Sequence, residues 1–130
     1  MEVDLAITAD MGNLQRLPSI VGHGNAMELS LTARTFSGRE ALRLGLVSGA
    51  FPDQQALLDG VMAVARGIAA KSPLAIVGTK RVLLYQRDHS VQDGLDYVAT
   101  WNSAMLPQSA DLGEVFAAKA EGRKPAFSKL

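Results

Sequence analysis

Two patterns of hydrophobic and polar residues divide the chain. Residues 2–7 alternate polar and apolar side chains, which is the period of a half-buried β-strand. From residue 54 onward the apolar side chains recur at helical spacing. The first such stripe consists of Leu57, Val61, Val64, Ala65 and Ile68. The sequence therefore predicts a mostly α-helical chain with one or two short strands in its first part.

Caps and stops place the boundaries of the shorter elements. Asn25 can cap a helix over residues 26–33, and Ser37 with Glu40 fits a capping box at the start of the next helix. Gly45 is a natural stop for that helix, and residues 46–51 are expected to form a brief strand or extended piece. A helix followed by a strand is common at the edge of a larger α/β core.

The second part is predicted to be three or four amphipathic helices. They are expected over residues 54–70, 73–86 and 90–105, with a last helix that Ser109 opens and Gly122 stops. Gly78 should weaken its helix by about 1 kcal/mol relative to alanine. Trp101 is the only tryptophan, and packing is its simplest role.

Composition excludes several classes of protein. Thirteen basic residues balance 13 acidic ones and no long basic run occurs, which argues against binding to nucleic acid. No apolar stretch approaches the roughly 20 residues that span a bilayer, and no secretory signal is expected. The chain has no cysteine, so it has no disulfide, thiol nucleophile or cysteine-ligated metal.

Several runs of residues carry a family resemblance. The turn after the first strand contains Asp10, and Gln15-Arg16-Leu17 follows it. Further runs lie at residues 29–34, 40–41, 45–48, 51–52, 71–73 and 96–102. Together they resemble the crotonase (enoyl-CoA hydratase/isomerase) superfamily over essentially the whole chain. An acidic residue in the turn, where common hydratases carry a glycine-rich run, is most similar to the Δ3,5-Δ2,4-dienoyl-CoA isomerase branch.

The resemblance implies a domain organisation. Residues 1–53 would be the C-terminal remnant of the crotonase core, which is an α/β spiral fold. Residues 54–122 would be the helical oligomerisation region of a homo-oligomer, a trimer or hexamer, and residues 123–130 a tail. In the family, an N-terminal half of similar or larger size precedes these segments.

The resemblance also singles out two carboxylates. Taken alone, Glu2 and Asp10 are ordinary exposed acids, as most unpaired carboxylates are. By resemblance, Asp10 would remove a proton beside the thioester carbonyl of an acyl-CoA, and Glu2 would return one at the far end of the dienoyl group. Two tuned carboxylates can perform such a shift without a cofactor or metal, since the substrate is itself a CoA thioester.

Part of the expected machinery is not matched in this sequence. The enolate needs preorganised hydrogen-bond donors, and in the family these come from segments upstream of residue 1. We therefore expect the 130-residue chain alone to be inactive or nearly so. The alternatives are enoyl-CoA hydration, a Δ3-Δ2-enoyl-CoA isomerisation, and a non-catalytic assembly fragment of the same family.

The remaining candidates lie outside this pair. Ser128-Lys129-Leu130 at the C-terminus matches the tripeptide that the peroxisomal import receptor reads, which predicts a peroxisomal location. His23 and His89 lack a second His or a Cys at ligand spacing, so surface or capping roles are expected. Arg123 and Lys124 could meet a CoA phosphate or simply be solvated.

Overall fold

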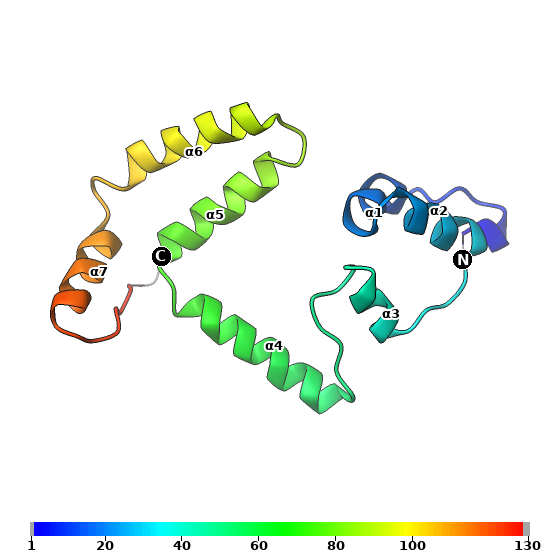
Figure 1. Cartoon of the computed structure of the whole chain (residues 1–130), viewed down its shortest axis with the longest axis horizontal. Coiled ribbons are helices and arrows are strands. Elements are labelled where there is room, and N and C mark those ends of the chain that lie inside the picture. The colour runs from blue at the N-terminus through cyan, green and yellow to red at the C-terminus, as the bar shows by residue number, and fades with distance from the viewer. Residues whose placement is uncertain (1, 129–130) are drawn as a thin grey trace. The chain divides into compact units, whose positions relative to one another are not determined.

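The computed structural model describes residues 2–128 and consists of helices and connecting segments (Figure 1). The elements are η1 (Val3–Leu5), α1 (Asn13–Val21), α2 (His23–Thr32), α3 (Gly38–Arg43), α4 (Gln54–Ala69), α5 (Pro73–Tyr85), α6 (Val91–Met105) and α7 (Ala110–Ala120). They divide into an N-terminal unit, Met1–Asp59, and a C-terminal unit, Gly60–Leu130. The prediction of a mostly helical chain is confirmed.

The strand predicted at residues 2–7 is wrong. The segment instead forms η1, a single 3₁₀ turn, in which the Glu2 carbonyl accepts from the amides of Leu5 (2.9 Å) and Ile7 (3.0 Å). A strand needs a neighbouring strand for its backbone groups, and residues 2–128 contain none. The local turn satisfies the Glu2 carbonyl without such a neighbour, although it places Ala6 in the left-handed region at φ 56°.

The extended piece predicted after α3 has no strand partner either, and residues 46–51 are bends and coil. The predicted stop at Gly45 is confirmed. Its φ is 74°, its amide bonds to the Leu42 carbonyl, and the Leu46 amide bonds to the Ala41 carbonyl. These two bonds form a Schellman motif, which ends the helix by satisfying its last carbonyls.

The small core of the N-terminal unit lies where α1 and η1 pack against α2. Val21 on α1 and Ala26 and Leu29 on α2 are buried there. Asn25 does not cap α2 as predicted, because the helix begins three residues earlier, at His23 after Gly22. The Asn25 side-chain amide instead donates to the Val21 carbonyl at 2.8 Å. The connection between the helices is thus tied by a side chain inside the second one.

The C-terminal unit is organised by the packing of α5 against α6. Gly78 is buried on α5, and a Cβ added there would lie 2.5 Å from Nε1 of Trp101 on α6. The glycine that weakens the helix therefore allows the tryptophan to approach. This contact supports the packing role expected of Trp101.

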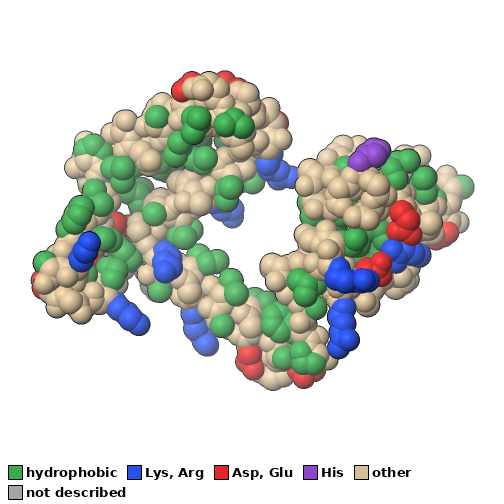
Figure 2. Space-filling view, viewed as in Figure 1, with side chains coloured by type: hydrophobic (Ala, Val, Ile, Leu, Met, Phe, Trp, Pro, Cys, Tyr) green, Lys and Arg blue, Asp and Glu red, His purple; other side chains and the backbone are tan. Residues whose placement is uncertain are grey.

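Much apolar surface remains exposed in both units (Figure 2). The stripe on α4 is open, with Val64 at 64% exposure, and α4 has no buried residue. Within residues 2–128, no single helix is long and apolar enough to cross a membrane. Helices α4 and α5 meet that test only as a pair, which is bent by 108° at its break.

Candidate active site

The first predicted acid, Glu2, is the residue that caps η1. Its side chain is exposed, while its carbonyl anchors the 3₁₀ turn. An extended strand from residue 2 to residue 10 would span roughly 26–29 Å. The structure has no such strand, and η1 replaces its first part with a single 3₁₀ turn.

The second predicted acid, Asp10, is exposed in the coil that leads into α1. Gly12 caps that helix with φ 84°, a conformation that glycine adopts without strain. The guanidinium of Arg16 folds back over this turn, and its Nη1 donates to the Met11 carbonyl at 3.4 Å. Asp10 is therefore held by a backbone turn that a side chain of α1 covers.

Exposed apolar side chains surround the two acids in the sequence. They are Val3, Leu5, Ile7 and Met11, and Met11 is 85% exposed. A carboxylate that exchanges protons with carbon needs a site from which water is largely excluded. The described residues bury neither acid, and the four apolar side chains are exposed as well.

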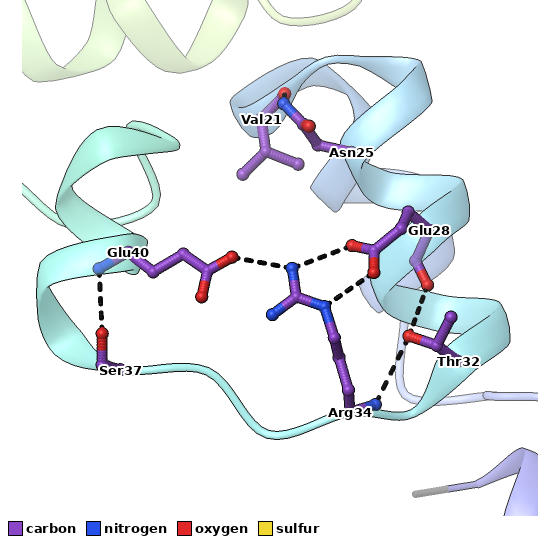
Figure 3. Close-up of polar contacts among 7 residues, drawn as sticks. All are labelled: Val21, Asn25, Glu28, Thr32, Arg34, Ser37 and Glu40. Carbon is purple, nitrogen blue, oxygen red and sulfur yellow. Dashed lines mark hydrogen bonds and ion pairs between the residues drawn. The ribbon is translucent and has the colours of Figure 1, made fainter.

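An ion-pair network links α2 to α3 in the N-terminal unit (Figure 3). Arg34 follows α2 and donates to both oxygens of Glu28, at 2.6 and 3.0 Å, and to Glu40 on α3 at 2.7 Å. The hydrogen bonds from Arg34 lower the pKa of both Glu28 and Glu40. The two carboxylates raise the pKa of Arg34 in return.

The same network changes the predicted capping box. Ser37 accepts from the Glu40 amide at 3.2 Å, which confirms the cap at the start of α3. The Glu40 carboxylate does not complete the box but bonds to Arg34. A complete box occurs instead at Ser90 and Asp93, where the sequence predicted a helix start.

Sequence reasoning missed an apolar cavity of about 440 Å³ in the C-terminal unit. It lies among α5, α6 and α7, and Trp101, Val82 and Val115 contribute to its wall. At its rim, the Ser72 hydroxyl donates to the Asp111 carboxylate at 2.5 Å. Ser72 also caps α5 by accepting from the Ala75 amide, and no local pattern indicates a partner 39 residues away.

The histidines behave as expected of non-catalytic residues. His23 is exposed at the start of α2. His89 stacks on Tyr85 with ring centroids 3.6 Å apart, and its Nδ1 lies 2.7 Å from both the Tyr85 carbonyl and the Asp88 carboxylate. These contacts raise the pKa of His89, the Tyr85 carbonyl most strongly. Residues 2–128 hold no group of three His, Asp or Glu side chains placed to bind a metal.

The basic pair near the C-terminus is partly occupied. Arg123 donates to Glu114 and Glu121, and the Ala126 amide donates to Glu114 at 2.8 Å. The Arg123 hydrogen bond and the Ala126 amide together lower the pKa of Glu114 to about 2. A phosphate would have to displace these carboxylates from Arg123. Of the tripeptide predicted to be a targeting signal, Ser128 is exposed, while Lys129 and Leu130 lie outside the described residues.

Comparison with solved structures defines the class of fold. The chain superposes on an enoyl-CoA hydratase from Bacillus anthracis with a TM-score of 0.90 and 30% identity, covering 97% of this chain and 48% of that one. An enoyl-CoA hydratase from Mycobacterium tuberculosis gives a TM-score of 0.88 and 34% identity, with 98% and 50% covered. Coverage of about half agrees with the prediction of a C-terminal portion of the crotonase fold.

Sequence comparison narrows this class to a family. The Enoyl-CoA hydratase/isomerase profile matches residues 1–129, and the chain belongs to this family. It is 64% identical to the peroxisomal Δ3,5-Δ2,4-dienoyl-CoA isomerase of Arabidopsis thaliana over 99% of this chain. It is 46% identical to the mitochondrial Δ3,5-Δ2,4-dienoyl-CoA isomerase of Rattus norvegicus over 99% of this chain. It spans 46% of the first relative and 40% of the second, less than half of each.

Proposed function

We propose that this chain contributes Glu2 and Asp10 to a Δ3,5-Δ2,4-dienoyl-CoA isomerase. The observation that carries the proposal is the 64% identity to a relative of that name, which extends over 99% of this chain. The turn at Gly12 and the 3₁₀ turn at Glu2 support it, because each fixes the backbone next to one acid. An acid in place of a glycine-rich turn disfavours hydration.

In the proposed reaction the acyl chain loses a proton at C2 and gains another at C6. The Asp10 carboxylate takes a proton from C2 of the 3,5-dienoyl thioester, and the electron pair delocalises into the carbonyl as a dienolate. Protonated Glu2 then gives its proton to C6, which leaves double bonds at C2 and C4. Asp10 ends protonated and Glu2 ionised, so proton exchange with solvent must restore both before the next turnover.

The exposure of both acids supports the expectation that the chain is inactive alone. A dienolate requires preorganised donors in a site that excludes water, and the acids here face solvent. The segments that complete the relatives' length would supply the donors and cover Val3, Leu5, Ile7 and Met11. Acyl-CoA is then the substrate of the completed enzyme.

A chimera tests this proposal. In it, this chain replaces the matching 46% of the Arabidopsis relative, so that the full length is restored. We expect the chimera to isomerise 3,5-dienoyl-CoA and the 130-residue chain alone to show no turnover. Asp10→Asn and Glu2→Gln should each lower kcat by about 10²–10⁴-fold. A folded chimera without activity, or variants as active as the parent, would refute the assignment.

We also propose that the enzyme is a peroxisomal homo-oligomer. The open stripe on α4 supports association, because exposed apolar patches commonly mark interfaces. The peroxisomal relative and the C-terminal Ser-Lys-Leu support the location. A fluorescent fusion at the N-terminus should enter peroxisomes, and removal of Leu130 should leave it in the cytosol. Light scattering of the chimera should give a trimer or hexamer.

A further inference from the structure

Arg16 occupies an electrostatically unfavourable position. It lies in the first turns of α1, where the helix dipole is positive and a cation is disfavoured. Its hydrogen bond in the described structure is to the Met11 carbonyl. The guanidinium folds back onto the turn before the helix, and this placement calls for an explanation other than helix stability.

The guanidinium of Arg16 occupies the space where a side chain at position 12 would begin. A Cβ built on Gly12 would lie 2.7 Å from Nη1, 3.2 Å from Cζ and 3.4 Å from Nη2 of Arg16. Any side chain at this position would displace the guanidinium, in addition to the strain of φ 84°. Gly12 and Arg16 therefore form a pair, in which the Arg16 guanidinium takes the space that a side chain at position 12 would need.

The Gly12–Arg16 pair contacts Met11, the residue that follows Asp10. Arg16 Nη1 donates to the Met11 carbonyl at 3.4 Å, so the peptide group between Met11 and Gly12 is held from one side. Rotation of that peptide would swing the backbone that carries Asp10. The link is long for a hydrogen bond and exposed, so it contributes orientation more than stability.

We propose that Arg16 is a positioning residue for Asp10, acting through the Met11 carbonyl and the space above Gly12. The inference rests on the proposed isomerase function. It assigns Arg16 no contact with substrate and no charge effect on the acid. Its consequence is kinetic: a displacement of about 1 Å at a reacting group costs up to about 100-fold in rate.

The full-length chimera provides the test. We expect Arg16→Met to lower kcat about tenfold with KM changed less than twofold, because substrate binding does not involve the turn. The isotope effect on C2-deuterated substrate should rise, since removal of that proton becomes slower. The pH profile of kcat should stay in place, which excludes a charge effect. Arg16→Lys keeps a donor but not the planar cover, so its kcat should be intermediate.

Arg34→Met is the matched control. Arg34 also lies in the N-terminal unit, where it ties α2 to α3. None of its atoms is among those close to Gly12. It should lower the melting temperature more than Arg16→Met does, yet leave kcat within twofold. Amide exchange at residues 11–13 should accelerate in Arg16→Met and not in Arg34→Met.

The outcomes separate the two proposals. An inactive but folded parent chimera overturns the isomerase function, and this inference with it. An active parent with an unchanged kcat in Arg16→Met, or equal kcat losses in Arg16→Met and Arg34→Met, overturns the inference alone. If Arg16→Met does not fold, Arg16→Lys is judged by the same criteria: an unchanged kcat and isotope effect refute the role.

Discussion

Different kinds of contact stabilise the N-terminal unit and the C-terminal unit internally. In the N-terminal unit, charged side chains tie short helices across loops, as Arg34 does with Glu28 and Glu40. In the C-terminal unit, longer helices pack directly, with Trp101 against Gly78 and Tyr85 stacked on Tyr97 at 4.5 Å. The Ser72–Asp111 hydrogen bond there joins the starts of α5 and α7, and Arg123 pairs with Glu114 and Glu121 at the end of α7.

The candidate catalytic acids and the directly packed helices therefore lie in different units. The candidate acids lie in coil and a 3₁₀ turn of the N-terminal unit, where backbone turns and exposed side chains set their positions. The C-terminal unit contributes apolar surface and a 440 Å³ cavity. Substitutions should therefore affect one unit without the other.

The largest effect is expected at the contact of α5 with α6. Gly78→Ala places a Cβ 2.5 Å from Trp101 Nε1, so the helices must separate or the ring must move. Overpacking of this kind costs about 1–3 kcal/mol in the free energy of unfolding. Trp101 fluorescence during urea unfolding reports on this unit, because the chain has no other tryptophan.

Gly67→Ala on α4 is the control, since nothing lies within 4 Å of the added Cβ. This variant should be more stable by up to about 1 kcal/mol, the difference in helix propensity. If both alanine variants gain stability, direct packing does not hold the C-terminal unit and the comparison fails.

A smaller effect is expected at the start of α5. Ser72→Ala removes the cap on the Ala75 amide and the hydrogen bond to Asp111, and should lower the unfolding free energy by about 1–2 kcal/mol. Ser109→Ala removes only the cap on Leu112 and should cost about 1 kcal/mol. Equal losses in urea titrations would mean that the link from α5 to α7 adds nothing.

Acid should weaken the ties of both units. Glu28 and Glu40 have lowered pKa values, so their contribution is complete above the unfolded pKa and is lost as pH falls through the folded one. The pKa of Glu114 is lowered from 4.5 to about 2, so its contribution to stability is lost as the pH falls between these two values. Amide chemical shifts of α2 and α3 should follow this titration in the parent, and in Arg34→Met they should follow it at higher pH, because the two carboxylates lose the Arg34 hydrogen bonds. A titration unaltered by that substitution would contradict the network.

The smallest effect is expected at His89 and only in the C-terminal unit. Its raised pKa means that its contribution is complete below the unfolded pKa, about 6.5, and is lost as pH rises through the folded value. The Tyr85 and Tyr97 side-chain resonances should therefore shift on this rise, and His89→Gln should abolish the shift. A titration of His89 below its ordinary pKa would reverse the predicted sign.

Sequence reasoning succeeded where structure is local. The helix start at Ser90 and the stop at Gly45 depend on neighbouring residues, and both occur as predicted. It failed at residues 2–7, because alternation describes a strand only when another strand is present to pair with it. It also missed the Ser72–Asp111 contact and the Arg34 network, since both join residues through the fold.

The candidate site shows the same limit. Alternation and spacing said nothing of a role for Glu2 and Asp10, which came from the resemblance to a family. The place of Arg16 over Gly12 was not predicted at all, because glycine in a turn does not indicate which side chain will cover it. Its signal was the glycine itself, four residues before an arginine in the first turns of a helix.

The division of labour between the two acids is tested most directly by proton exchange in D₂O. In the chimera carrying Glu2→Gln, Asp10 should still remove the C2 proton, so 3,5-dienoyl-CoA should gain deuterium at C2 without being isomerised. The chimera carrying Asp10→Asn should show neither exchange nor isomerisation. Deuterium at C2 in the Asp10→Asn chimera, or none in the Glu2→Gln chimera, would contradict the account.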